Sequence, residues 1–200
     1  MVTSSNKLAP LYPVIMEVPK DLQQLAGRTK VATLSRLARE ALSISCQKGE
    51  WPITDLKKNE KGAPLSERGH YWSLSHKSQF VAGVAAPYPI GVDIEKLRPC
   101  SEALKRRIAT QEEWQLGPEI EPNLLFFRFW TAKEAVLKAV GVGMSGLFHC
   151  RIAKIYDEHR LCLVYKNTTF RVAQIQFSGH LAAVITDNRP IYWTHLLKSI

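Results

Sequence analysis

The chain has few cysteines and no long apolar run. Its four cysteines are Cys46, Cys100, Cys150 and Cys162, and no two of them form a Cys-x-x-Cys pair. This argues against a structural zinc site and favours the reduced thiols of a cytoplasmic protein. No apolar segment is long enough to span a bilayer, and the N-terminal sequence MVTSSNKLAP lacks the apolar core of a signal peptide. We therefore expect a cytoplasmic protein without a membrane partner.

Acidic residues are scarce relative to basic ones. The 18 Asp and Glu residues face 27 Lys and Arg residues, which gives a formal net charge of +9. Such a surplus favours anionic partners, and charge alone leaves nucleic acid, anionic lipid, acidic protein and phosphorylated small molecules open. The basic residues are dispersed and form no recognised nucleic-acid motif, which disfavours nucleic acid among these partners.

The hydrophobic pattern divides the first part of the chain into a helix, a loop, two strands and a second helix. Apolar residues recur at helical spacing over 30–46, and the polar segment 47–70, broken by Gly and Pro, predicts a long loop. Two apolar runs, 79–86 and 90–96, predict a hairpin-like pair of strands on either side of a Pro-containing breaker. A further helix is expected over 101–116.

The stretch 126–146 carries an acid and a base on one side of a predicted helix. Trp130, Glu134 and Lys138 are each four residues apart, so they share one stripe, and the helix is expected to stop at Gly141. The neighbouring residues are mostly apolar. This pattern fits either an ordinary surface ion pair or a buried functional pair, because an unpaired buried carboxylate is costly.

The remainder of the chain is typical of strands. These are expected over 149–156, 160–166, 169–177, 180–186 and 190–196. A histidine precedes a pair of apolar strands twice, at His76 and at His180. The echo favours two similar α+β halves produced by internal duplication, although chance produces such an echo equally readily.

The segment Gly91-Val92-Asp93-Ile94-Glu95 predicts a strand with two carboxylates on one face. Side chains alternate along a strand, so Asp93 and Glu95 point away from the apolar side. Two neighbouring carboxylates repel unless they are protonated or bridged by a cation. Their oxygens suit Mg²⁺ or Mn²⁺, and Glu134 from the helix would complete a three-carboxylate site. A solvated acidic edge strand is the alternative.

Two other short segments are less informative. Ser75-His76-Lys77 lies just before the first apolar strand, where it is either a phosphate contact or an unrelated surface segment. The sequence over 141–146 matches Gly-x-Gly-x-x-Gly. It follows a helix and not a strand, so it does not predict a dinucleotide site.

Two motifs in a fixed order carry a family resemblance. GVDIEKLRP at 91–99, followed by FWTAKEAVLK at 129–138, resembles the paired motifs of the 4′-phosphopantetheinyl transferases of the Sfp/AcpT type. The segment Trp72-Ser73-Leu74-Ser75-His76 resembles an upstream motif of the same family. The resemblance implies an α+β fold of two similar halves, 1–98 and 99–200, in a pseudo-twofold arrangement with the active site in the cleft between them.

The resemblance also implies a reaction. The 4′-phosphopantetheine group of coenzyme A would pass to a serine of an apo acyl or peptidyl carrier protein, with Mg²⁺ as cofactor and 3′,5′-ADP as the other product. Asp93, Glu95 and Glu134 would hold the metal. Glu134 would also assist removal of the serine proton, and Lys138 would stabilise the departing 3′,5′-ADP. An acidic carrier protein would suit the basic chain, and an internally duplicated chain is expected to be a monomer.

Contacts with coenzyme A follow from the resemblance by position. They are Ser75, His76, Lys133, Lys138, Lys61, Lys30 and Arg28. The sequence departs from the family pattern at 62–64, where Gly62-Ala63-Pro64 lacks a basic residue between glycine and proline and Lys61 stands one place earlier. Ser73 and Lys77 also replace a usual asparagine and a usual serine.

Two alternative functions fit the sequence. A catalytically impaired family member that binds coenzyme A as a scaffold would be consistent with the altered segment 62–64. A non-enzymatic basic module that binds nucleic acid would use the surplus charge together with tryptophans such as Trp72, Trp114 and Trp130. Metal-dependent labelling of an apo carrier protein with a fluorescent coenzyme A separates an enzyme from both alternatives.

Overall fold

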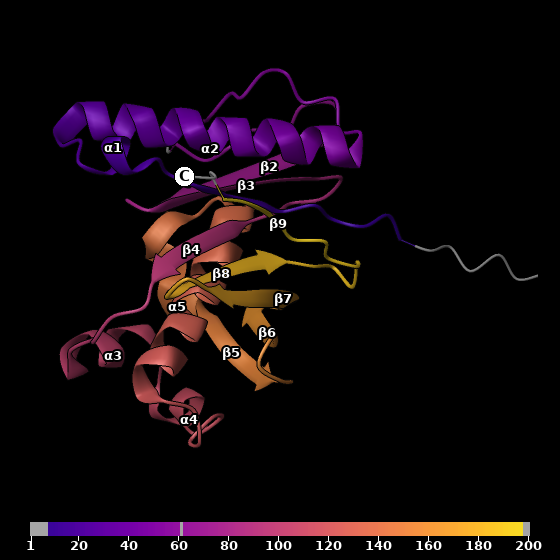
Figure 1. Cartoon of the computed structure of the whole chain (residues 1–200). Coiled ribbons are helices and arrows are strands. Elements are labelled where there is room, and N and C mark those ends of the chain that lie inside the picture. The colour runs from indigo at the N-terminus through magenta and orange to yellow at the C-terminus, as the bar shows by residue number, and fades with distance from the viewer. Residues whose placement is uncertain (1–7, 61, 198–200) are drawn as a thin grey trace, which may run out of the picture.

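The computed structural model describes residues 8–60 and 62–197, which form a mixed α and β structure with two sheets (Figure 1). Its elements are β1 (Val14–Glu17), α1 (Lys20–Gln23), α2 (Gly27–Gly49), β2 (Tyr71–His76), β3 (Phe80–Ala86), β4 (Val92–Lys96), α3 (Glu102–Ile108), α4 (Gln111–Trp114), α5 (Pro122–Val140), the 3₁₀ helix η1 (Gly143–His149), β5 (Cys150–Ile155), β6 (Arg160–Tyr165), β7 (Thr168–Phe177), β8 (His180–Ile185) and β9 (Thr194–Leu196). The expected α+β class is confirmed. None of the described helices is long and apolar enough to cross a membrane.

Each of the two sheets contains strands from both the first and the second part of the chain. The strand order is β2-β3-β1-β9 in one sheet and β4-β8-β7-β6-β5 in the other. The β9 strand lies parallel to β1, so the end of the chain joins the first sheet. The β4 strand pairs with β8 and belongs to the second sheet. The division of the chain into halves at residue 98 stays a prediction.

The expected hairpin between 79–86 and 90–96 is wrong. The β3 strand pairs with β1 and β2, while β4 pairs with β8 in the other sheet. Every residue of β3 is buried, so this strand needs a partner on each side. The sequence reading missed β2, which contains Ser73 and Ser75. Both serine hydroxyls are buried, and they accept hydrogen bonds from Val92 N and Ile94 N of β4.

Glycines allow a long helix to press closely against each sheet. A Cβ atom built on Gly83 of β3 would come within 2.4 Å of the Leu42 nitrogen in α2. A Cβ atom on Gly91, just before β4, would come within 1.8 Å of the Ala135 oxygen in α5. Only glycine permits these approaches. The close contact at Gly91 brings the last turns of α5 beside the carboxylates of β4.

The ends of the helices follow local capping rules. The Glu121 side chain accepts hydrogen bonds at the start of α5, and Gly141 ends it with a φ of 69°, which confirms the expected stop. The helix expected over 101–116 is instead divided into α3 and α4. Thr110 forms a capping box with Glu113 and so begins a new helix within that segment.

Candidate functional site

A pocket of about 200 Å³ lies at the C-terminal end of α5. It is lined by Gly62, Ala63, Pro64, Glu134, Leu137, Lys138, Gly141, Val142 and Gly143. The loop 62–64 and the helix motif around Glu134 are far apart in sequence, and the fold brings both into the lining of one pocket. Lys61, expected to contact coenzyme A from this loop, lies outside the described residues.

Lys138 ties α5 to two strands beside this pocket. Its Nζ donates to Asp93 Oδ1 at 2.8 Å and to Val92 O at 2.9 Å on β4, and to Leu74 O at 3.3 Å on β2. The side chain is 28% exposed, so its charge is close to solvent while its position is fixed. The helix motif and the strand motif identified in the sequence therefore meet through this lysine.

Asp93 is a buried carboxylate with one satisfied oxygen and one unsatisfied oxygen. Its Oδ1 accepts from Lys138 and, at 2.9 Å, from Ser75 Oγ, which in turn accepts from Ile94 N. Its Oδ2 is buried and has no partner among the residues that the structure describes. An unpaired buried acceptor is costly, and a cation would remove that cost. The hydrogen bond from Ser75 holds the Asp93 carboxylate in place.

Glu95 points to the same region from the next outward position of β4. Its Oε1 forms a 2.7 Å ion pair with Lys77 Nζ and accepts a 2.9 Å hydrogen bond from Trp130 Nε1. The sequence reading considered Lys77 as a possible phosphate contact and as a departure from the family pattern, and it gave neither Lys77 nor Trp130 a contact with Glu95. The helical stripe shared by Trp130 and Glu134 was the signal that could have linked this tryptophan to the carboxylates.

Glu134 lies in the electrostatic field of the other two carboxylates. Burial raises the pKa of its carboxyl group above the ordinary value of 4.5, and the negative charge of Asp93 raises it further. Lys138 opposes these effects, Glu95 adds to them, and Lys77 opposes them. A raised pKa makes Glu134 a better proton acceptor near neutral pH.

The three carboxylates have the oxygen donors that Mg²⁺ prefers, and the unsatisfied Asp93 Oδ2 fits a cation. In the arrangement described, however, no three acidic, histidine or cysteine side chains among residues 8–60 and 62–197 stand close enough together to hold a metal ion. Lys138 and Lys77 pair with Asp93 and Glu95 there. A metal would therefore fit these donors only with some rearrangement of the side chains.

A basic cluster surrounds the end of β2. His76 is exposed there, and its surroundings lower the pKa of its imidazole, first by partial desolvation and then through the charge of Lys138. Lys77 and Lys58 contribute in the same direction. Lys58, which the sequence reading did not select, lies 6.0 Å from the Trp72 ring centroid and next to Pro64 in a β-bridge. Three lysines therefore act on His76, and two of them, Lys138 and Lys77, also pair with Asp93 and Glu95.

Lys133 does not belong to the basic cluster at the end of β2. Its Nζ forms a 2.7 Å ion pair with Glu113 and donates to Ile108 O at 2.7 Å, and the lysine is 2% exposed. Helical geometry could have shown this, because Lys133 and Lys138 are five residues apart and so roughly 140° apart around the helix. A contact between Lys133 and a phosphate would first require the buried pair to break.

The two basic residues expected near the nucleotide lie on α2. Lys30 Nζ donates to Gln23 O at 3.0 Å, and Arg28 is exposed in the first turn of the helix. Within the described part of the chain, no hydrogen bond or ion pair joins either residue to Asp93, Glu134 or Lys138. Their proposed contacts with coenzyme A stay predictions.

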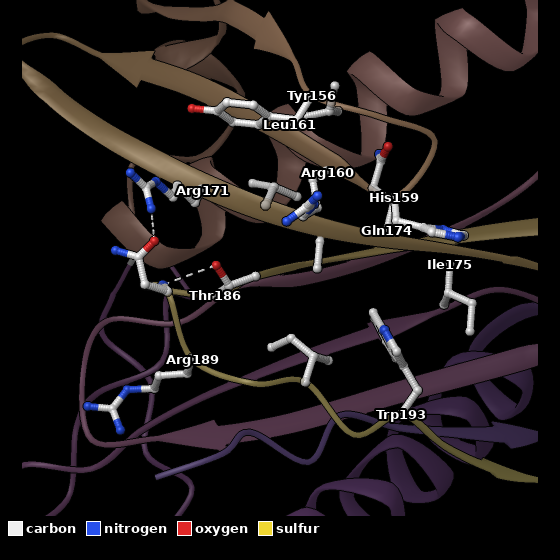
Figure 2. A pocket seen from close by; sticks show the side chains of 14 residues that line it. Tyr156, His159, Arg160, Leu161, Arg171, Gln174, Ile175, Thr186, Arg189 and Trp193 are labelled. Carbon is white, nitrogen blue, oxygen red and sulfur yellow. Dashed lines mark hydrogen bonds between the residues drawn. The ribbon is translucent and has the colours of Figure 1, made fainter. Parts of the chain in front are cut away.

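A second and larger cavity, of about 640 Å³, lies between β6, β7 and the segment 186–193 (Figure 2). It shares no lining residue with the pocket at α5, and it contains none of the residues selected from the sequence. It is therefore a separate feature of the molecule.

Comparison with known proteins shows which family the region that contains the carboxylates resembles. Residues 89–187 match the family model of the 4′-phosphopantetheinyl transferase superfamily, and this range includes all of β4 and α5. The 4′-phosphopantetheinyl transferase HetI of Nostoc sp. is 41% identical over 99 residues, which is 46% of this chain and 41% of that protein. The 4′-phosphopantetheinyl transferase psf-1 of Bacillus pumilus is 33% identical over 96 residues, with the same two shares.

A longer and weaker similarity extends beyond that region. The L-aminoadipate-semialdehyde dehydrogenase-phosphopantetheinyl transferase of Rattus norvegicus is 26% identical over 168 residues, which is 70% of this chain and 52% of that protein. The chain thus spans about half the length of the curated relatives it matches. The family expected from the paired motifs is confirmed: this chain belongs to the 4′-phosphopantetheinyl transferase superfamily.

Proposed function

We propose that this chain transfers the 4′-phosphopantetheine group of coenzyme A to a serine of an apo acyl or peptidyl carrier protein, with release of 3′,5′-ADP. The observation that carries the proposal is that Glu134 and Lys138 line one pocket and that Lys138 pairs there with Asp93, all within the segment that matches the family. The names of the relatives support the same transferase activity.

Asp93, Glu95 and Glu134 would hold Mg²⁺, or Mn²⁺ in its place. When bound, the metal supplies neutralising charge to the pyrophosphate of coenzyme A. The unsatisfied, buried Oδ2 of Asp93 supports this assignment. Lys138 and Lys77 already pair with two of the three carboxylates, so an arriving cation competes with them.

Other residues of the chain have separate roles in proton transfer, charge stabilisation and coenzyme A binding. Glu134, whose pKa is raised, accepts the proton of the carrier serine, directly or through a water molecule. Lys138 places its charge where the departing 3′,5′-ADP gains negative charge. The cluster of His76, Lys77 and Lys58 binds phosphate groups of coenzyme A. Ser75 orients Asp93 through the hydrogen bond between their side chains.

The wider expectations belong to the same proposal. We infer a pseudo-twofold arrangement of two halves from the two long helices, each pressed against its own sheet at a glycine, Gly83 or Gly91. The formal charge of +9 supports an acidic carrier protein as partner. A monomer acting in the cytoplasm completes the proposal.

The test is the mass of the carrier protein. Candidate apo carriers are incubated with this chain, coenzyme A and MgCl₂, and each intact carrier is weighed by mass spectrometry. We expect the mass of one phosphopantetheine to be added, and the addition to stop when EDTA removes the metal. Failure to modify any apo acyl or peptidyl carrier, while a known transferase modifies the same samples, would contradict the proposal.

A further inference from the structure

The larger cavity, formed by β6, β7 and the segment 186–193, has a polar end and a more apolar end, although His159 and Gln174 also lie toward the more apolar end. Figure 2 shows Arg171 and Thr186 toward one end and Ile175 and Trp193 toward the other. Ile191 also lines the cavity, and Leu161 and Val172 contribute fully buried apolar surface. A volume of about 640 Å³ is in the range of cavities that enclose small organic ligands.

The polar end presents hydrogen-bond donors. Arg171 donates to Asn188 Oδ1, so the side-chain amide nitrogen of Asn188 is left to donate. The Thr186 hydroxyl oxygen accepts from Asn188 N at 3.3 Å, which leaves its own proton to donate. A guanidinium, an amide and a hydroxyl thus offer protons in one place, and such a group binds an anion.

Two arginines that line the cavity, Arg171 and Arg189, form no ion pair with a carboxylate among residues 8–60 and 62–197, and the Arg171 guanidinium is the one of the two that faces the cavity. Arg160 forms a 2.6 Å ion pair with Asp157. The Arg189 guanidinium points away from the cavity, where it donates to Ala9 O and lies over the Tyr88 ring. His159 pairs with Glu158. Among residues 8–60 and 62–197, no carboxylate lies within ion-pair distance of Arg171.

We propose that this cavity binds an amphiphilic monoanion, a carboxylate carried on an apolar chain. The carboxylate lies against Arg171, Asn188 and Thr186, and the chain lies between Ile175 on β7 and Trp193 on the opposite wall. Arg171 is the arginine without an ion pair that faces the cavity, so it matches a single negative charge, and the more apolar end matches the chain. The inference is independent of the transfer reaction, because the cavity shares no residue with the pocket at α5.

Octanoate and its neutral isostere octanamide test the proposal by isothermal titration calorimetry. We expect octanoate to bind at least tenfold more tightly than octanamide, because it adds a charge-assisted hydrogen bond to the same apolar contact. In the Arg171→Gln variant the difference between the two ligands disappears. The matched control is Arg106→Gln, which removes the same charge from an exposed position of α3 outside the cavity and leaves the difference unchanged.

The position of the ligand is checked by NMR. Octanoate should shift the indole N–H signal of Trp193, assigned with Trp193→Phe, more than the indole signals of Trp51 and Trp114, which do not line the cavity. Equal affinities for octanoate and octanamide would overturn the proposal. So would an Arg171→Gln variant that binds octanoate as tightly as the unchanged chain, or the absence of saturable binding of octanoate.

Discussion

Helix α5 carries two lysines, five residues apart, whose ion pairs differ in nearly every respect. Lys133 pairs with Glu113 inside the protein, and both side chains are at most 5% exposed. Lys138 pairs with Asp93 at the edge of a pocket and is 28% exposed. The Glu113 carboxylate is fully engaged, because Ile152 N and Thr110 N also donate to it. Asp93 keeps one oxygen without a partner in the described part of the chain.

We propose that this difference distinguishes a pair that stabilises the fold from a pair that acts in the transfer reaction. A buried carboxylate whose oxygens are all satisfied has no capacity left for a ligand, and its removal affects only the fold. A carboxylate with an unsatisfied oxygen beside a partly exposed lysine can exchange its partner for a cation. The two pairs on one helix thus allow stability and activity to be changed separately.

The largest expected effect is on stability, at the buried pair. Lys133→Met should lower the free energy of unfolding by about 3–5 kcal/mol, because it leaves the Glu113 carboxylate buried without its counter-charge. Urea denaturation followed by circular dichroism measures the loss. The double variant Lys133→Met with Glu113→Leu should recover most of it, since a matched apolar pair replaces the charges. If the single variant were as stable as the unchanged chain, the structural role of the pair would be refuted.

The next effect is on activity, at the pair of Lys138 and Asp93, in which the lysine is partly exposed. Lys138→Met should lower the rate of carrier modification by about 100-fold, the scale of a lost charge-stabilising group. It should reduce stability less than Lys133→Met does, because Lys138 is partly exposed. The rate is measured by mass spectrometry at saturating coenzyme A, and binding of coenzyme A is measured separately by calorimetry. A variant with weakened binding and an unchanged rate at saturation would contradict the role in transfer.

A smaller effect is expected at Lys77, which pairs with Glu95 and in our proposal competes with the metal for it. Lys77→Ser should tighten Mn²⁺ binding by about two- to fivefold, because an ion pair with a partly exposed lysine contributes up to about 1 kcal/mol. Mn²⁺ binding is followed directly by electron paramagnetic resonance. Lys96→Ser, at the next residue of β4 after Glu95, is the control and should leave the affinity closer to that of the unchanged chain. Weaker Mn²⁺ binding after Lys77→Ser would show that Lys77 assists the metal.

The smallest effect concerns pH and His180, which belongs to neither pair and lies on β8 beside β4. Burial lowers the pKa of His180 below its ordinary value of 6.5, so the folded protein favours the neutral ring. The stability from this neutral ring is present above pH 6.5 and is lost as the pH falls through the lowered pKa. Thermal unfolding temperatures should therefore decrease below about pH 6.5. His180→Phe, which retains an aromatic ring beside Phe80 and Phe177, should make that decrease shallower.

Helical and strand periodicity predicted the helix and the strand that carry the site residues. It could not predict which side chains contact each other, because those contacts join elements that are distant in the sequence. The stripe of Glu134 and Lys138 and the alternation of Asp93 and Glu95 were readable because each repeats at the period of its element. The β2 strand was missed because Ser73 and Ser75 break its apolar pattern. Their hydroxyls are buried only because β4 lies beside them.

The pairing of strands was the part least accessible to sequence reasoning. Proximity along the chain favoured a hairpin between the strands now seen as β3 and β4, while burial of β3 on both sides required β1 and β2 as its neighbours. The parallel addition of β9 to β1 links the two ends of the described chain, and no local pattern indicates it. Lys133 and Lys138 were both expected to contact coenzyme A because both belong to the family motif. The angle between them around the helix, which separates them, was not considered.

The central claim is that the β4 carboxylates bind a divalent cation at the pocket of α5, and Mn²⁺ titration of Asp93→Asn tests it most directly. We predict one saturable Mn²⁺ site in the unchanged chain and its loss in the variant, with the circular dichroism spectrum of the two proteins the same. An Asp93→Asn protein that binds Mn²⁺ as tightly as the unchanged chain would contradict the claim.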